Sequence, residues 1–421
     1  MKYNYSEVIS IIENTRRFGT LTGYEVSKSI LEQLGNPQSG IPFVHVAGTN
    51  GKGSTTAFLC KILEQTGKKI GMFTSPHLIT FEERIRINGE YISKEDVTRL
   101  GNLLLETKFS VSPTMFDYCL AMAMLYFKEQ QCDLMVIETG IGGRYDSTNA
   151  LGIPEVAVIT KIGFDHTAVL GNTIEEIAGE KAGIIKPGVS VVTSMQEPAA
   201  EGVLYDNFVK MNAVQYYKIS HSDILYAKSL PMRMTGEYQL ENAATAIAAA
   251  KILFEKWNGE SSFEISENQQ EEFIKKGIAE TFWKGRMEIV NEDPFFMIDG
   301  AHNGHGVHAL SESLKALYPG EKFHFIMGVM ADKDYEEMIE ELLPLAIDFV
   351  TVTPESSRAL QSEDLAECIQ KKGVPARFVK NMEEAILPLL TQKDVTVEKT
   401  IAFGSLYFIG AIEAMLEKNN N

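Results

Sequence analysis

The fold of this chain is decided by Val46-Ala47-Gly48-Thr49-Asn50-Gly51-Lys52-Gly53-Ser54-Thr55. An apolar run over residues 41–47 leads into this stretch and predicts a buried strand, and apolar residues at helical spacing follow it, from Ala57 to Leu63. A strand, a glycine-rich turn, a lysine, hydroxyls and a helix together are typical of a phosphate-binding loop. Glycines let the backbone approach an anion closely, and a helix N-terminus supplies N–H groups with partial positive charge.

The spacing of this loop differs from the common G-x-x-x-x-G-K-[ST] pattern. Position 46 is Val rather than Gly, and Gly53 separates Lys52 from the first hydroxyl. We expect Lys52 to neutralise β- and γ-phosphate oxygens, and Ser54 or Thr55 to bind Mg²⁺. A glycine-rich turn that binds nothing is the alternative, but all the surrounding signals agree with a nucleotide site. The expected nucleotide contacts in the loop are Gly48, Thr49, Asn50, Gly51, Lys52, Gly53, Ser54 and Thr55.

Composition restricts the class of protein. The chain has 421 residues, of which 44% are hydrophobic and 23% charged, and this suits a globular protein of two or three domains. The formal net charge of −18 opposes binding to nucleic acid or to an anionic membrane surface. No apolar run is long enough to span a bilayer, and the N-terminus lacks the pattern of a signal peptide. Four scattered cysteines without C-x-x-C spacing favour a reducing cytoplasm and argue against a disulfide framework.

Strand-like and helix-like segments alternate along the chain, which is typical of a mostly parallel sheet with helices on both faces. Near residue 291 the alternation starts again, so we expect two α/β domains, over residues 1–290 and 291–421. The expected strands are 43–47, 69–73, 134–138, 156–161 and 189–193, then 295–299, 323–328, 347–353 and 400–403. The expected helices include 55–65, 115–128, 174–182 and an alanine-rich helix from near Leu240 to Phe254.

Polar residues at strand ends are the candidates for chemistry, because ligands of open parallel sheets bind at the carboxyl ends of the strands. Glu138 ends an apolar strand and is placed as a carboxylate directed at Mg²⁺, with a turn or cap role as the alternative. His166 follows the next strand. Mg²⁺ prefers oxygen, so the residue alone leaves His166 open between a metal ligand and a local structural role. Ser75 could offer Mg²⁺ another oxygen, although the segment around it, Thr74 to Leu78, also fits a plain turn when taken alone.

Two further segments carry charged or imidazole side chains. Asp299 and His302 close the first strand of the second domain and are expected to contact nucleotide or substrate. His302, His305 and His308 suggest zinc only weakly, because no cysteine or carboxylate completes the set and residues three apart rotate off one helix face. Lys181 lies near the end of a helix, where a lysine is ordinarily solvated.

Together these motifs make the chain resemble the folylpolyglutamate synthase and dihydrofolate synthase family, within the Mur-ligase-like ATP-dependent amide synthetases. The match spans roughly residues 40–410 in order. The loop alone is shared with other Mur-type ligases, whereas the combination with the motifs that follow it is specific to the folate branch. The matching segments are AGTNGKGST (47–55), TSPHL (74–78), ERIRI (83–87), ETGIGGRYDSTN (138–149), DH (165–166), EKAGIIK (180–186), YQLENA (238–243), GR (285–286), DGAHN (299–303), DKD (332–334) and GSLY (404–407).

The resemblance implies a fold and a set of site residues. The fold would be an α/β protein, with an N-terminal P-loop-type ATPase domain built on a mostly parallel sheet and a smaller C-terminal Rossmann-like domain that carries the glutamate-ligase part. The cofactors would be ATP and Mg²⁺ in two sites. The residues that match the family's metal positions are Ser54, Ser75, Glu138, His166 and Lys181, the last as a carbamylated lysine. Asn242, Arg286 and Asp299 match nucleotide-contacting positions, and Asp146 and His302 fall near the reacting groups, so that the expected catalytic set is Lys52, Asp146, His302 and Lys181.

The implied activity is ATP-dependent addition of L-glutamate to the glutamyl carboxylate of folate, through an acyl phosphate. Two acceptor ranges fit the residues equally well: folate alone, or folate and dihydropteroate. Two alternative hypotheses remain: a Mur-type ligase that acts on a non-folate carboxylate, and a nucleotide-gated binding module without turnover. A Mur-type ligase with a nucleotide-sugar carrier would need an extra N-terminal domain, and only about 40 residues precede the loop. The family suggests a monomer.

Overall fold

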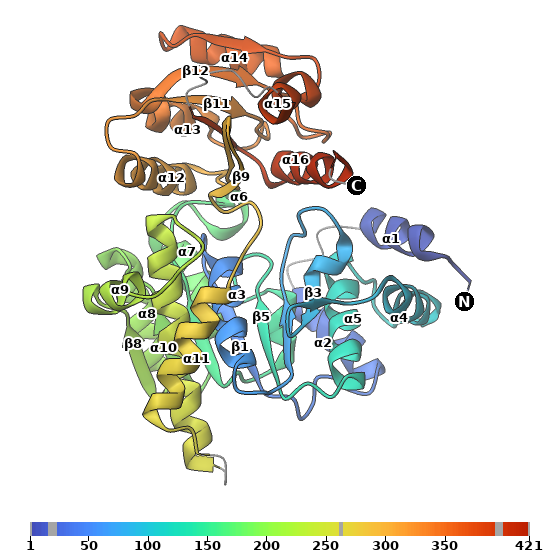
Figure 1. Ribbon diagram of the computed structural model, residues 1–421. Coiled ribbons are helices and arrows are strands. Elements are labelled where there is room, and N and C mark those ends of the chain that lie inside the picture. Colours follow the sequence, from blue (N-terminus) through green and yellow to red (C-terminus); the bar gives the residue numbers. More distant parts are fainter. Residues whose placement is uncertain (1, 16–22, 261–263, 392–398, 420–421) are drawn as a thin grey trace. The chain divides into compact units, whose positions relative to one another are not determined.

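The computed structural model describes residues 2–15, 23–260, 264–391 and 399–419 (Figure 1). The chain divides into two compact units. Unit 1 comprises Met1–Arg233 and Leu240–Thr281, and unit 2 comprises Met234–Gln239 and Phe282–Asn421. Each unit contains one sheet flanked by helices, and each is described separately below.

Unit 1 is built on an eight-stranded, mostly parallel sheet. Its strands, in spatial order, are β4 (Glu90–Tyr91), β3 (Ile85–Ile87), β2 (Ile70–Phe73), β5 (Leu134–Glu138), β1 (Phe43–Ala47), β6 (Val156–Ile159), β7 (Ser190–Thr193) and β8 (Gln215–Lys218). The six strands from β2 to β8 in this order run parallel, whereas β3 and β4 form an antiparallel edge. In register, Val46 is opposite Glu138 and Ala47 is opposite Ile159, so the loops that follow β1, β5 and β6 leave the sheet at one edge.

Helices cover both faces of this sheet because its central strands are apolar along their whole length. One buried cluster lies among α1, α2, α4 and α5, and another lies against α7 and α8. The helices of unit 1 are α1 (Tyr5–Asn14), α2 (Gly23–Gln33), α3 (Lys52–Glu64), α4 (Lys94–Glu106), α5 (Met115–Glu129), α6 (Thr167–Leu170), α7 (Ile174–Lys181), α8 (Pro198–Lys210), α9 (His221–Lys228), α10 (Glu237–Glu260) from Leu240 onward and α11 (Glu267–Glu280), and the 3₁₀ turns are η1 (Phe81–Arg84), η2 (Ser147–Leu151) and η3 (Ala182–Ile184). The first three residues of α10 belong to unit 2.

Unit 2 contains a six-stranded sheet, whose order is β13 (Ala376–Phe378), β12 (Ala346–Thr351), β11 (Phe323–Met327), β14 (Thr400–Phe403), β10 (Phe295–Ile298) and β9 (Glu288–Glu292). Five strands are parallel, and β9 is an antiparallel edge. Phe325 stacks on Phe349 and meets Phe403 edge-on, which fills the core between neighbouring strands. The helices are α12 (Gly304–Leu317), α13 (Tyr335–Leu342), α14 (Ser362–Lys371), α15 (Met382–Thr391) and α16 (Leu406–Asn419), with a 3₁₀ turn, η4 (Leu343–Leu345).

The predicted fold class, a mostly parallel N-terminal α/β sheet followed by a smaller α/β unit, is confirmed. Two helix starts differ from the expectation. The helix after the loop begins at Lys52 rather than Thr55, because Gly51 in the left-handed region occupies the cap and lets the next residue enter the helix. The alanine-rich helix begins at Glu237, before Leu240. Five short strands were not expected: β4, β8, β9 and β13, which are the edge strands of the two sheets, and β3, which lies next to β4.

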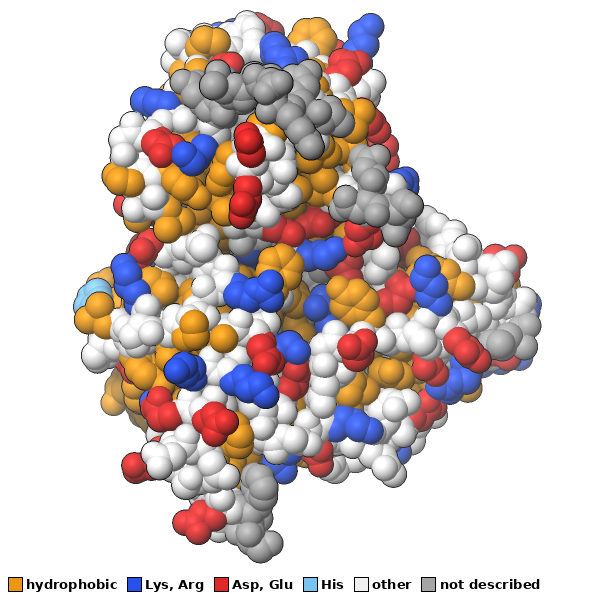
Figure 2. All heavy atoms as spheres, viewed as in Figure 1, with side chains coloured by type: hydrophobic (Ala, Val, Ile, Leu, Met, Phe, Trp, Pro, Cys, Tyr) orange, Lys and Arg blue, Asp and Glu red, His pale blue; other side chains and the backbone are white. Residues whose placement is uncertain are grey.

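The surface carries both signs of charge. On the face in view in Figure 2, Lys and Arg side chains are interspersed with Asp and Glu rather than gathered into one basic stripe. Within the described residues, no helix is both long and apolar enough to cross a membrane.

Candidate functional site

The loop between β1 and α3 has a backbone that glycine alone accepts without strain. Gly48 has φ +156° and Gly51 has φ +87°. A Cβ atom on Gly48 would lie 1.8 Å from Oγ1 of Thr160, and one on Gly51 would lie 2.1 Å from Oδ1 of Asn242. Both glycines are therefore required by close approach of neighbouring side chains as well as by backbone conformation.

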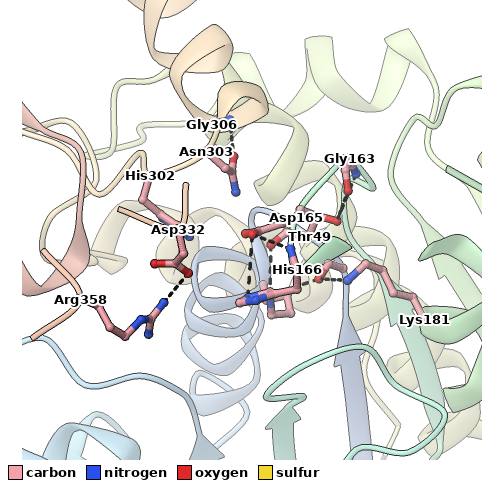
Figure 3. Close-up of polar contacts among 12 residues, drawn as sticks. Thr49, Gly163, Asp165, His166, Lys181, His302, Asn303, Gly306, Asp332 and Arg358 are labelled. Atoms are coloured by element: carbon pink, nitrogen blue, oxygen red, sulfur yellow. Dashed lines mark hydrogen bonds and ion pairs between the residues drawn. The ribbon is translucent and has the colours of Figure 1, made fainter. Parts of the chain in front are cut away.

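The loop is tied to the end of β6. The backbone N–H of Thr49 donates to the Lys161 carbonyl at 2.9 Å, and the Thr160 hydroxyl donates to the Asn50 carbonyl at 2.7 Å. The Thr49 hydroxyl also donates to the carbonyl of Gly163 at 2.9 Å (Figure 3). These bonds fix the loop before any ligand arrives, so the N–H groups at the start of α3 keep a defined direction.

Two lysines converge on one carbonyl of the loop. Lys52 donates through Nζ to the carbonyl oxygens of Gly48 and Thr49, each at 3.1 Å, and Lys181 donates through Nζ to the same Gly48 oxygen at 2.8 Å. Figure 3 shows the Lys181 side chain directed at the loop. The amino groups of Lys52 and Lys181 therefore both lie within hydrogen-bonding distance of the Gly48 carbonyl oxygen.

Lys181 is 3% exposed, although a lysine near the end of a helix ordinarily reaches solvent. Burial and, to a lesser extent, the neighbouring Lys52 charge lower its pKa to about 7, against the opposite effect of Asp165 and Asp146. A large fraction of the amine is therefore neutral near pH 7, and a neutral amine is the form that reacts with carbon dioxide.

Ser54 and Thr55 lie in the first turn of α3, and both are buried. The Thr55 hydroxyl lies 3.5 Å from Oδ1 of Asn242, so α10 reaches the loop through the Asn242 amide. The structure therefore brings Asn242 to the loop, as expected of a residue that contacts the nucleotide.

A second group of side chains, which could bind a metal ion, lies where β5 and β2 end. Glu138 is the last residue of β5 and is 4% exposed, and its Oε2 accepts the backbone N–H of Ser75 at 3.0 Å. His166 follows β6 in the left-handed region, with φ +51°, and its backbone N–H donates to Oδ1 of Asp165 at 2.8 Å. The His166 ring is exposed, and its Nε2 lies 4.0 Å from the same Oδ1 of Asp165.

These donors fit Mg²⁺ by their chemistry. Ser54, Ser75 and Glu138 supply the oxygens that Mg²⁺ prefers, and His166 adds a nitrogen. Among the described residues, no three His, Cys, Asp or Glu side chains group closely enough to hold a metal. A Mg²⁺ ion here would therefore depend on hydroxyls, on water and on nucleotide phosphates, as this ion commonly does.

Asp146 is buried, and its carboxylate is surrounded by donors. Oδ2 accepts the backbone N–H of Ile141 at 2.8 Å, and Oδ1 accepts the N–H of Thr148 at 3.0 Å together with the Thr148 hydroxyl. Burial raises the pKa of this carboxyl, and the hydrogen bonds oppose that change. The same turn lies against the end of α7: the N–H of Arg144 donates to the Glu180 carbonyl at 2.7 Å, and a Cβ atom on Gly143 would lie 2.8 Å from the Lys181 carbonyl oxygen. This environment suits a carboxylate that holds geometry better than one that removes protons.

In unit 2, Asp299 holds the segment that follows β10. Its Oδ2 accepts the Tyr238 hydroxyl at 2.8 Å and the N–H of Met287 at 2.9 Å, and its Oδ1 accepts the N–H of Ala301 at 2.8 Å. Burial and the Asp299 charge raise the Tyr238 pKa well above its usual value, so Tyr238 remains a donor. Arg286 is next to Met287, and a Cβ atom on Gly300 would meet its guanidinium at 2.7 Å, so Arg286 and Asp299 lie together.

His302 is fixed by the backbone. Its Nδ1 lies 2.8 Å from the Gly300 carbonyl, which can only accept, so Nδ1 carries the proton and Nε2 is the basic nitrogen of the neutral ring.

Asn303 caps α12 by accepting the N–H of Gly306 at 2.7 Å, and Arg358 pairs with Asp332 at 2.6 Å (Figure 3). His308 lies 3.1 Å from Oε1 of Glu341, and the weak zinc alternative at the three histidines has no supporting cluster within the described residues.

The residue-by-residue search from sequence missed two side chains that shape these sites. Thr160 holds the loop through the Asn50 carbonyl, and Tyr238 holds Asp299. A hydroxyl directly after the strand β6 was a usable signal for Thr160. No local signal could have linked Tyr238 to Asp299, because 61 residues separate them.

Comparison with known proteins gives consistent matches over both units. The Mur ligase middle domain matches residues 46–250, and the Mur ligase, glutamate ligase domain matches residues 285–397. The Dihydrofolate synthase/folylpolyglutamate synthase of Bacillus subtilis is 36% identical, covering 98% of this chain and 99% of that protein. Among solved structures, Mycobacterium tuberculosis folylpolyglutamate synthase complexed with ADP has a TM-score of 0.85 at 28% identity, covering 98% of each chain. Escherichia coli FolC in complex with DHPP and ADP has a TM-score of 0.84 at 27% identity, covering 100% of this chain and 99% of that one.

Proposed function

We propose, since the chain belongs to the folylpolyglutamate synthase and dihydrofolate synthase family of Mur ligases, that it is an ATP-dependent ligase. It joins the amine of L-glutamate to the glutamyl carboxylate of a folate and releases ADP and phosphate. The observation that carries the proposal is the loop of residues 48–55, with Lys52 and the buried Lys181 converging on the Gly48 carbonyl. ADP bound to two structural relatives supports the nucleotide.

The reaction needs ATP because a carboxylate is a poor acylating agent. An oxygen of the folate carboxylate attacks the γ-phosphorus of ATP, ADP leaves, and an acyl phosphate forms. The neutral amine of glutamate then adds to the acyl carbon, and phosphate leaves with the carboxylate oxygen. Stabilising charge on the transferring phosphoryl group is the main task of the protein.

The loop of unit 1 performs that task. Its N–H groups at the start of α3 bind phosphate oxygens, and Lys52 turns from the loop carbonyls to the β- and γ-phosphates. Ser54, Ser75, Glu138 and His166 would hold Mg²⁺ in two sites, and the metal would neutralise phosphate oxygens. Addition of carbon dioxide to the neutral amine of Lys181, with loss of a proton, would give a carbamate that could serve as a further oxygen ligand.

Three side chains contact the nucleotide outside the loop: Asn242 in unit 1, and Arg286 and Asp299 in unit 2. His302 accepts a proton or hydrogen bond from the glutamate amine through Nε2, since Nδ1 is bound to the Gly300 carbonyl. Asp146 orients the reacting groups instead of removing a proton, because its two oxygens already accept three hydrogen bonds.

The setting is a monomer in the cytoplasm, without nucleic acid or membrane as partner. All four cysteines are free, which suits a reducing compartment. The formal net charge of −18 opposes contact with nucleic acid or anionic lipid.

One assay determines whether the protein uses folate alone or both folate and dihydropteroate as acceptors of glutamate. Glutamate-dependent release of phosphate from ATP and Mg²⁺ is measured with tetrahydrofolate and with 7,8-dihydropteroate in separate reactions. We expect turnover with tetrahydrofolate, and turnover with both acceptors identifies a bifunctional enzyme. ATP binding without turnover on either acceptor would contradict the proposal. It would favour a Mur-type ligase with another carboxylate substrate, or a nucleotide-gated binding module.

A further inference from the structure

His45 is a polar residue in the middle of the apolar strand β1. It is 0% exposed and lies opposite Ile137 and Ala157 on the neighbouring strands. Burial lowers the pKa of the ring to about 3, so the imidazole is neutral. Its Nδ1 has no hydrogen-bond partner. An aliphatic side chain would occupy this position at lower free-energy cost, so the histidine calls for a reason other than stability.

The other ring nitrogen begins a chain of hydrogen bonds. Nε2 of His45 lies 2.8 Å from the Thr148 hydroxyl, and the same hydroxyl bonds Oδ1 of Asp146. A hydroxyl has one proton, and the Asp146 carboxylate can only accept. Thr148 therefore donates to Asp146, and His45 donates to Thr148 from a protonated Nε2. This order leaves Nδ1 as the unprotonated nitrogen, which costs less to bury unpaired than an N–H.

The residues on either side of Thr148, Ser147 and Asn149, bond to other parts of the protein than His45. The Ser147 hydroxyl donates to Oδ1 of Asp117 at 2.8 Å, and Asp117 caps α5 through Thr114. The side-chain amide of Asn149 donates to the Arg144 carbonyl at 2.9 Å. These bonds anchor the turn to α5 and to its own loop.

The bond to His45 is different, because it joins the turn to the strand that carries the phosphate-binding loop. His45 lies three residues before Gly48 on the same chain segment, so β1 carries both the loop and the donor. A strand paired on both sides is a rigid connection.

We propose that His45 and Thr148 are positioning residues, which set the Asp146 carboxylate relative to the phosphate-binding loop through the chain His45–Thr148–Asp146. The inference rests on the proposed ligase activity, in which Asp146 lies beside the reacting groups. Small errors in such a geometry slow the chemical step more than they weaken binding of the nucleotide.

Thr148→Val gives the first test, because valine keeps the shape and removes the hydroxyl. We expect kcat for glutamate-dependent phosphate release to fall by ~10-fold to ~100-fold, the size of one hydrogen bond to a charged group. ADP affinity stays at the wild-type value, and Thr148→Ser recovers most of the loss. Thr281→Val is the matched control: the buried Thr281 hydroxyl donates to the Gly277 carbonyl at the end of α11, outside the residues proposed for the site, so its removal leaves kcat unchanged.

Variants of His45 test the other end of the chain. His45→Leu is expected to keep or raise the melting temperature while lowering kcat. His45→Gln, whose amide N–H replaces the Nε2 donor, recovers activity. Combined with Asp146→Asn, His45→Leu adds little further loss, because both changes break the same chain.

Different results would contradict the role of His45 and Thr148 and the proposed ligase activity. Wild-type kcat in Thr148→Val would overturn the inference, as would loss of ADP binding in step with kcat or additive losses in the double variant. Absence of glutamate-dependent phosphate release in the wild-type protein would instead contradict the ligase activity itself.

Discussion

Replacing Lys181 by methionine removes a buried charge and keeps the length of the side chain. In the folded chain the amine has a pKa of about 7, against the ordinary value of 10.5. Between these values the unfolded chain binds more protons than the folded one, so the free energy of unfolding rises with pH. The difference between 10.5 and about 7 corresponds to a cost of about 5 kcal/mol, present in full below pH 7 and lost as the pH rises to 10.5.

The assay is urea unfolding of the wild type and of Lys181→Met at pH 7, 8 and 9, in buffer free of bicarbonate. Both proteins carry Trp283→Phe, so that the fluorescence of Trp257 reports unit 1. We expect Lys181→Met to be the more stable protein at pH 7, and its advantage to shrink by about 2 kcal/mol between pH 7 and pH 9. Other groups that titrate in this range do so in both proteins and cancel in the difference.

Two results would exclude a lowered pKa of Lys181 or a net cost of burying its amine. Parallel stability curves from pH 7 to pH 9 would mean that the Lys181 amine keeps its ordinary pKa. A wild type that is more stable than Lys181→Met at pH 7 would mean that the bond to Gly48 outweighs the cost of burial. When bicarbonate is added, intact-protein mass spectrometry under mild conditions should show a carbon dioxide adduct on the wild type and none on the variant.

Three further changes have defined outcomes. Lys52→Ala should lower the turnover of ATP by ~10²-fold or more, on the scale of a lost electrostatic contact in the transition state, and near-normal phosphate release would exclude a role in binding phosphate. Gly51→Ala should weaken binding of an ATP analogue measured by calorimetry, because its Cβ would meet Asn242 at 2.1 Å and the backbone is left-handed; unchanged affinity would show that the loop adapts. Tyr238→Phe should lower the free energy of unfolding of unit 2 by about 1–3 kcal/mol, because Asp299 loses a buried donor, and an unchanged urea midpoint would contradict that bond.

Much of the fold could be predicted because its central strands are continuous apolar runs. The bounds of β1, β5 and β14 agree with the expectation residue for residue. The edge strands could not be found in this way, since β8 (Gln215–Lys218) and β9 (Glu288–Glu292) contain polar residues on a half-exposed edge and are held by pairing with their neighbours. Pairing of this kind is a property of the tertiary fold.

In the candidate site, too, the features that depend on local sequence could be predicted, and those that depend on the tertiary fold could not. The loop of residues 48–55 and Glu138 could be predicted from local sequence, because the loop follows an apolar strand and Glu138 ends one. The burial of Lys181 depends on the turn at residues 143–144 packing against it, which no local pattern contains. His45 did leave a signal, as a polar residue within an apolar strand, but its partner Thr148 lies 103 residues away.

In the proposed reaction, a folate carboxylate is activated by phosphorylation before glutamate attacks it. The most direct test uses tetrahydrofolate with ¹⁸O in its glutamyl carboxylates, together with ATP, Mg²⁺ and L-glutamate, and measures the isotope in the released phosphate by mass spectrometry. We expect one ¹⁸O atom in each phosphate released, and a folate product longer by one glutamyl residue in equal amount. Phosphate without the isotope, or phosphate released without the longer product, would contradict it.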